Sequence, residues 1–94
     1  MNIQHKHKEN SGAFIMEDNN ELLAEMVYKQ PNNDTMIIEH TEISEKLKGQ
    51  GVGVKLLNSA ADYARKENLK IVPACSFVLA MFNKKEEYKD VWKK

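Results

Sequence analysis

The chain has 94 residues, of which 41% are hydrophobic and 30% charged, and its formal net charge is zero. This length and composition predict one globular domain, residues 1–94, with a single modest core. A balanced charge argues against a general nucleic-acid binder, which carries a basic excess. No apolar run approaches the roughly 20 residues of a membrane span. With one cysteine and no signal-peptide pattern, we expect a cytoplasmic protein.

The first half of the chain predicts an antiparallel meander of strands. Residues 2–8 fit a polar edge strand, and residues 13–16 fit a short apolar strand. Apolar and polar side chains alternate over residues 21–29, as in a half-buried strand. Turn-forming residues at 31–34 then lead as a hairpin into an extended strand at 35–43.

The second half predicts a crossover helix and a parallel strand. A helix over residues 52–67 places its leucines and alanines on one stripe. The short strand that follows, residues 69–72, is reached by a βαβ crossover and should lie parallel to the strand at 35–43. A short helix over residues 77–83 and a last turn over 88–92 complete the chain.

A glycine-rich segment with the sequence Lys48-Gly49-Gln50-Gly51-Val52-Gly53 joins the long strand to the long helix. Strand, glycine turn and helix start together suit a phosphate, because the first helical N–H groups are unpaired and that end is positive. The Walker loop does not fit, since Val54 follows the last glycine where that motif has lysine. The dinucleotide fingerprint does not fit either, since Leu56 takes the place of its last glycine. A glycine turn without any ligand is the alternative.

The glycine spacing resembles motif A of the GNAT superfamily of acyl-CoA N-acetyltransferases, Arg/Gln-x-x-Gly-x-Gly/Ala, with Lys48 in the first place. The segments His40-Thr41-Glu42-Ile43 and Pro73-Ala74-Cys75 are similar to a small, single-domain branch of that superfamily. The resemblance covers about residues 12–92. It implies an α/β (α+β) fold with a mixed, mostly antiparallel sheet, a motif-A helix and a βαβ crossover.

The resemblance also implies a cofactor, acetyl-CoA or coenzyme A. In the GNAT fold two parallel strands splay apart to admit the pantetheine arm, whose amides pair with the strand before motif A in the manner of an added strand. The residues expected to contact the cofactor are Thr41, Glu42, Ile43, Lys48, Gly49, Gln50, Gly51, Val52, Gly53, Val54 and Cys75.

Acetyl transfer needs a group that takes the proton of the amine, and we expect His40 or Glu42 to provide it. Strand alternation puts these two side chains on one face and Glu39 on the other. Histidine titrates near neutrality and suits a base or a group that orders water. The alternatives are a structural His40 that bonds a neighbouring strand and solvated carboxylates.

Cys75 is the third candidate catalytic residue, because it follows the short strand where the acyl sulfur should arrive. Many GNAT enzymes have an asparagine near this position and, seven residues later, a tyrosine that protonates the leaving thiolate. Here that later position is Phe82, which has no proton to give. Cys75 could donate a proton, accept the acetyl group as a nucleophile, or simply pack as a small apolar residue.

The acceptor amine cannot be read from the chain. Larger GNAT enzymes shape the acceptor pocket with two helices, for which residues 8–12 leave no room. Either the site is open and suits a protein or peptide amine, or a second subunit completes it in a homodimer. We therefore expect an N-acetyltransferase, with a CoA-binding regulatory or interaction module of little activity as the alternative. No metal site is expected, since His5 and His7 have no third ligand nearby.

Overall fold

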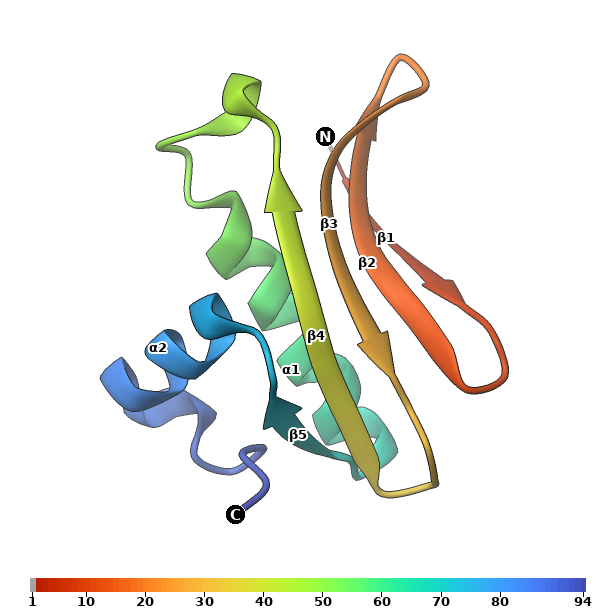
Figure 1. Ribbon diagram of the computed structural model, residues 1–94, viewed down its shortest axis with the longest axis vertical. Coiled ribbons are helices and arrows are strands. Elements are labelled where there is room, and N and C mark those ends of the chain that lie inside the picture. The colour runs from red at the N-terminus through yellow and green to blue at the C-terminus, as the bar shows by residue number, and fades with distance from the viewer. Residues whose placement is uncertain (1) are drawn as a thin grey trace.

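The computed structural model describes residues 2–94 as a twisted sheet with one long helix behind it (Figure 1). The sheet has five strands in the order β1-β2-β3-β4-β5. Neighbouring strands are antiparallel except β4 and β5, which are parallel. The elements are β1 (Ile3–His7), β2 (Ser11–Asp18), β3 (Glu21–Lys29), β4 (Thr35–Ile43), η1 (Glu45–Leu47), α1 (Val52–Glu67), β5 (Lys70–Pro73), α2 (Ser76–Lys84) and η2 (Glu86–Tyr88). The expected mixed, mostly antiparallel α/β fold is confirmed.

The boundaries differ from the predicted ones mainly at β2 and β5. β2 is longer than the apolar run 13–16, because its polar flanks pair with β3 from Ser11 opposite Lys29 onwards. β5 begins one residue later than predicted and includes Pro73, which pairs with Ile38 as the last residue of the strand. The helix predicted over residues 52–67 is present with those bounds.

Asparagine supplies the left-handed backbone at two boundaries. The turn between β2 and β3 has positive φ at Asn19 and Asn20, 51° and 66°, which matches the hairpin turn that follows the twist of the strands. Asn68 ends α1 with φ of 59°, and its N–H caps the carbonyls of the last turn. These asparagines therefore determine where the β2–β3 turn forms and where α1 ends.

The core lies between α1 and one face of the sheet. α1 packs across β2 to β5, and in Figure 1 it runs behind β4. None of the helices in residues 2–94 lies over the front of β1 to β4 in that view, and α2 lies beside β5. The fully buried side chains at the interface include Met26, Tyr28, Met36, Ile38, Leu56, Leu57, Ala60, Ala61, Ala64 and Ile71. The stripe predicted for the long helix is therefore its buried face.

The outer edge of β5 is covered by the C-terminal segment. The N–H of Ile71 donates to the carbonyl of Val91, and the N–H of Lys93 donates to the carbonyl of Ile71. Arg65 of α1 holds this segment through two hydrogen bonds to the Asp90 carboxylate, 2.7 and 3.1 Å long. The sheet is thus closed on this side. Within residues 2–94, no helix has both the length and the apolar character required to cross a bilayer.

Candidate functional site

β4 pairs with β5 along its first half only, and its pairing with β3 runs from Ile37 to Ile43. Residues 35–38 pair with β5 up to Ile38 opposite Pro73. Proline has no N–H to continue the ladder, and the N–H of Ala74 turns back to the carbonyl of Val72 at 3.0 Å. A bulge in the β3–β4 pairing at Val27/Tyr28 bends the strand at the same level. Over residues 39–43, none of the described strands pairs with the other edge of β4.

The direction of the backbone groups along this open edge follows from one hydrogen bond. The N–H of Ser44 donates to the carbonyl of Leu23 in β3 at 2.8 Å. Successive N–H groups of an extended strand point to opposite edges, and the register with β3 is regular from residue 40 to residue 43. Thr41 and Ile43 therefore direct their N–H and C=O groups toward the open edge.

The loop that follows β4 needs its first two glycines for backbone conformation. Gly49 and Gly51 have φ of 79° and 70°, a region that other residues seldom adopt. A Cβ placed at either glycine would meet no atom within 4 Å, so this stretch of the loop faces open space. The two glycines thus expose the backbone without themselves being packed.

The start of α1 presents unpaired donors beside this loop. The first helical hydrogen bond runs from Lys55 N–H to the Gly51 carbonyl at 3.1 Å. The N–H groups of Val52, Gly53 and Val54 find no acceptor among residues 2–94, as expected for the first turn of a helix. A hollow of about 300 Å³ lies here, lined by Ile43, Leu47, Lys48, Gly49, Gly51, Val52, Gly53, Val54 and Phe77. Free donors at the positive end of a helix suit a phosphate group.

The long side chains of the loop are held at its surface. Lys48 forms an ion pair with Glu45, with 3.0 Å between Nζ and Oε1. The amide of Gln50 donates to the carbonyl of Lys46 at 3.4 Å. Both contacts are solvent-exposed, so neither closes the hollow.

The third glycine of the loop serves a different purpose. Gly53 is buried in the first turn of α1, and a Cβ placed on it would lie 2.8 Å from Cζ of Phe77. Its missing side chain makes room for an aromatic ring of α2. Sequence reasoning did not find Phe77, although an aromatic residue two positions after Cys75, at a predicted helix start, was the available signal.

Cys75, which follows β5, lies beside the open half of β4. It is the residue before α2, is half-buried, and its thiol donates to the hydroxyl of Thr41 at 3.5 Å. Phe82, at the position where many GNAT enzymes have tyrosine, is buried and stacks on Tyr88 with 5.3 Å between ring centroids. It belongs to the core.

His40 and Glu42 lie together on the other face of β4. Their side chains are joined by a 2.7 Å contact between Nε2 and Oε1, and they are 55% and 72% exposed. The ring of His40 is paired within its own strand, whereas the structural alternative would pair it with a neighbouring strand. Because side chains alternate, Thr41 and its partner Cys75 are on the opposite face from His40. The structure does not bring His40 and Cys75 into contact. Glu39 is exposed at the bulge.

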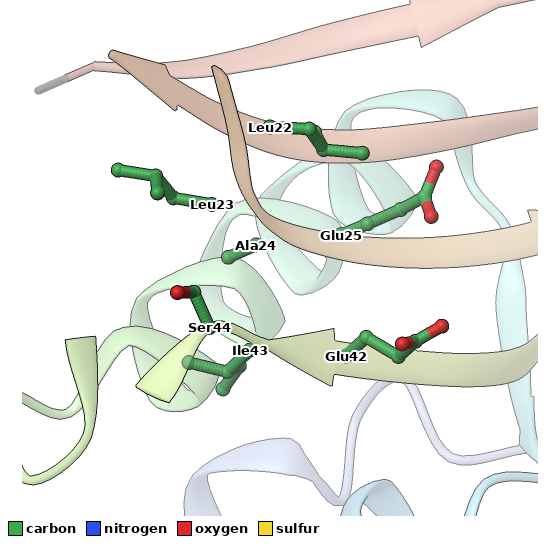
Figure 2. A pocket seen from close by; sticks show the side chains of 7 residues that line it. All are labelled: Leu22, Leu23, Ala24, Glu25, Glu42, Ile43 and Ser44. Carbon is green, nitrogen blue, oxygen red and sulfur yellow. The ribbon is translucent and has the colours of Figure 1, made fainter. Parts of the chain in front are cut away.

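A second hollow, of about 220 Å³, lies where β3 begins and β4 ends. Its lining consists of Leu22, Leu23, Ala24, Glu25, Glu42, Ile43 and Ser44. Glu25 and Glu42 are direct cross-strand partners, and Figure 2 shows their carboxylates on the same side of the two strands. Two neighbouring carboxylates give this face of the sheet, which also carries His40, a local negative potential.

The two N-terminal histidines belong to an aromatic cluster under α1. His5 Nε2 is hydrogen-bonded to the Tyr28 hydroxyl at 2.5 Å, and its ring stacks on Phe14 with 4.2 Å between centroids. Burial of the ring, and next the charge of His7, lower the pKa of His5. Burial and the neighbouring Tyr63 raise the pKa of Tyr28. Within residues 2–94, His, Cys, Asp and Glu side chains form no group of three that could hold a metal ion.

Comparisons with known proteins agree with this fold. Residues 13–91 match the family described as GCN5-related N-acetyl-transferase. The solution structure of a GCN5-like protein from Staphylococcus aureus is 41% identical, with a TM-score of 0.72, and the match covers 96% of this chain and 87% of that one. A search of the curated proteins found no match.

Two more distant structures share the fold. A GNAT family acetyltransferase from Elizabethkingia anophelis, solved with acetyl-CoA bound, is 22% identical with a TM-score of 0.60. That match covers 80% of this chain and 52% of that one, so the chain spans about half the length of that enzyme. Tetrahymena GCN5 is 14% identical with a TM-score of 0.63, over 93% of this chain and 62% of that one. From the family match and the Staphylococcus relative, the chain belongs to the GCN5-related N-acetyltransferase family.

Proposed function

We propose that this protein binds acetyl-CoA along the open half of β4 and transfers the acetyl group to an amine. The observation that carries this proposal is the order of three features. A helix start with free N–H groups is followed by an unpaired strand edge at residues 39–43, which leads to the thiol of Cys75. Acetyl-CoA has a matching order of diphosphate, pantetheine amides and thioester.

Each part of the cofactor has a group to bind. The N–H and C=O groups of Thr41 and Ile43 would pair with the pantetheine amides as an added strand pairs with a sheet edge. The backbone of residues 49–54 would hold the diphosphate. Lys48 would add a point charge after leaving Glu45, which costs little because an exposed ion pair contributes only about 0–1 kcal/mol.

A protonated amine must lose one proton before it attacks, and its nitrogen loses a second proton as the amide forms, while the CoA sulfur gains one. The amine nitrogen attacks the thioester carbonyl, a C–N bond forms, and the C–S bond breaks with its electron pair on the CoA sulfur. His40 is assigned the first of these two amine protons. When its Nε2–H donates to Glu42, Nδ1 is left with a free lone pair that can accept a proton.

The two faces of β4 would receive the two substrates. The thioester would lie beside Cys75 and Thr41, and the amine would approach from the face that carries His40. Glu25 and Glu42 make that face attractive to a protonated amine. This supports an acceptor such as a lysine side chain or the N-terminus of a protein or peptide. If a second subunit completes the acceptor site, the activity per mole will rise with protein concentration.

Cys75 is assigned to the sulfur end of the site, either as the proton donor to the leaving CoA thiolate or as a nucleophile that carries the acetyl group. The two roles are separated by incubating the protein with acetyl-CoA and no acceptor. A nucleophile will gain an acetyl mass on Cys75 that hydroxylamine removes, and Cys75→Ser will abolish transfer while CoA still binds. If Cys75→Ala keeps nearly full turnover, neither role holds.

Turnover itself is tested by acetylation of a panel of amines and peptides, followed by mass spectrometry of the products. Mass detection is preferable to a thiol reagent, because Cys75 is itself a free thiol. Acetylated product that depends on His40 supports the enzyme. CoA binding without acetylation of any amine supports a regulatory module, for which the core position of Phe82 is the relevant observation.

A further inference from the structure

Phe77 lies where three elements meet. It is the second residue of α2, and its ring points at the first turn of α1. A Cβ placed on Gly53 would be 2.8 Å from Cζ of Phe77, 3.2 Å from its Cε2, and 3.2 Å from Cδ1 of Ile43. The end of β4, the start of α1 and the start of α2 therefore converge on this ring.

The ring also forms the α2 side of the hollow beside the glycine loop. Phe77 and Ile43 line that hollow together with Gly49, Gly51 and Gly53. Neighbours on the same helix differ, since Val78 is fully buried in the core and Leu79 is 41% exposed outside the hollow. Phe77 is half-buried because one side packs on α1 and the other borders the hollow.

We propose that Phe77 is a specificity-determining residue that packs against the pantetheine arm, so that the site distinguishes CoA from nucleotides carrying the same phosphates. The inference rests on the proposed function, because it requires the arm to pass along Thr41 and Ile43. An arm on that path leaves the helix start, crosses the hollow beside Phe77 and reaches Cys75. The apolar ring contacts the arm only, whereas the diphosphate depends on backbone N–H groups.

This assignment also explains the third glycine of the loop. Gly53 has an ordinary helical backbone, in which alanine is the better helix former by about 1 kcal/mol. Glycine fits this position in the present chain because a methyl group would make the ring of Phe77 shift. Gly53 and Phe77 should therefore act as a coupled pair.

The test measures the affinity of CoA and of 3′-phospho-ADP, the nucleotide half of CoA without the pantetheine arm, by calorimetry. Phe77→Ala should weaken CoA roughly tenfold, about 1.4 kcal/mol, and leave 3′-phospho-ADP within about twofold. Leu79→Ala, an apolar truncation on the same helix, should change neither affinity. Gly53→Ala should weaken CoA in the wild-type background and have less effect in the Phe77→Ala background.

The outcomes separate this inference from the proposed function. If the wild type binds CoA but Phe77→Ala binds it unchanged, the inference is wrong and the proposed function stands. Equal loss for both ligands would also overturn it, because Phe77 would then only support the loop. Phe77→Leu, which retains an apolar side chain, provides a second variant should the alanine protein fail to fold. If the wild type binds neither ligand, the proposed function and the inference fall together.

Discussion

The two halves of β4 belong to one strand but differ in their pairing and burial. Residues 35–38 pair with β5, and all of them except Ile37 are buried, whereas residues 39–43 have no partner strand on that edge and are exposed or half-buried. The first half is held by packing, by pairing with β5 and, at Ile37 and Ile38, also by pairing with β3. The second half leaves the N–H and C=O groups of Thr41 and Ile43 free to bind a ligand. The comparison teaches that the site lies where sheet pairing stops, and substitutions in the two halves should have different kinds of effect.

Replacing Ile38 should give the largest loss of stability. Its side chain is fully buried between the sheet and α1, so Ile38→Ala should lower the free energy of unfolding by about 2–5 kcal/mol. Urea denaturation measures this loss. Ile37→Ala is the matched control, because Ile37 is on the opposite face and only half-buried. Equal losses at the two positions would contradict the division of the strand into faces.

A charge at Gly51 should affect the cofactor and leave the fold intact. Gly51 has φ of 70°, which aspartate and asparagine tolerate better than other side chains. Gly51→Asp should weaken CoA by at least roughly tenfold, about 1.4 kcal/mol, through repulsion of the diphosphate. Gly51→Asn is the control with the same shape and no charge. The loop does not hold phosphate if both variants bind CoA equally well in calorimetry.

His5 should make the stability of the protein depend on pH. The folded-state pKa of His5 is lowered from 6.5, so the unfolded chain binds its proton more readily. Stability should therefore decline as the pH falls below 6.5 and toward the lower folded-state pKa. His5→Gln should flatten this decline, as followed by melting temperature against pH. An unchanged decline would assign the pH dependence to other groups.

His40 should have the smallest effect on stability. Its side chain is 55% exposed and paired with Glu42 of the same strand, so His40→Gln should change the free energy of unfolding by no more than about 0.5 kcal/mol. Its effect should appear in kcat/KM, as loss of the limb that rises with pH. A uniform loss of activity with a lower melting temperature would make His40 structural.

Local patterns in the sequence were enough for most of the fold. Alternation over residues 21–29 and 35–43, the apolar stripe of the long helix and the glycine spacing each depend on near neighbours. Alternation also placed His40 and Glu42 on one face of the strand, where the structure joins them. The prediction that β4 and β5 diverge rested on the family resemblance, because periodicity carries no information about where strand pairing ends.

Two features of the site could not be read from local patterns. Phe77 approaches Gly53 across 24 positions of sequence, and only the packing of α2 on α1 brings them together. The separation of His40 from Cys75 by the strand itself likewise depends on which face of β4 the chain meets after β5. Both are consequences of tertiary packing.

The measurement that tests the central claim most directly is amide hydrogen exchange of residues 40–43, resolved by NMR, with and without CoA. The N–H groups of Thr41 and Ile43 face the open edge, so they should exchange rapidly in the free protein and become protected when CoA binds. Those of His40 and Glu42 face β3 and should be protected in both states. If CoA binds while Thr41 and Ile43 stay unprotected, the cofactor does not lie along β4 and the account is wrong.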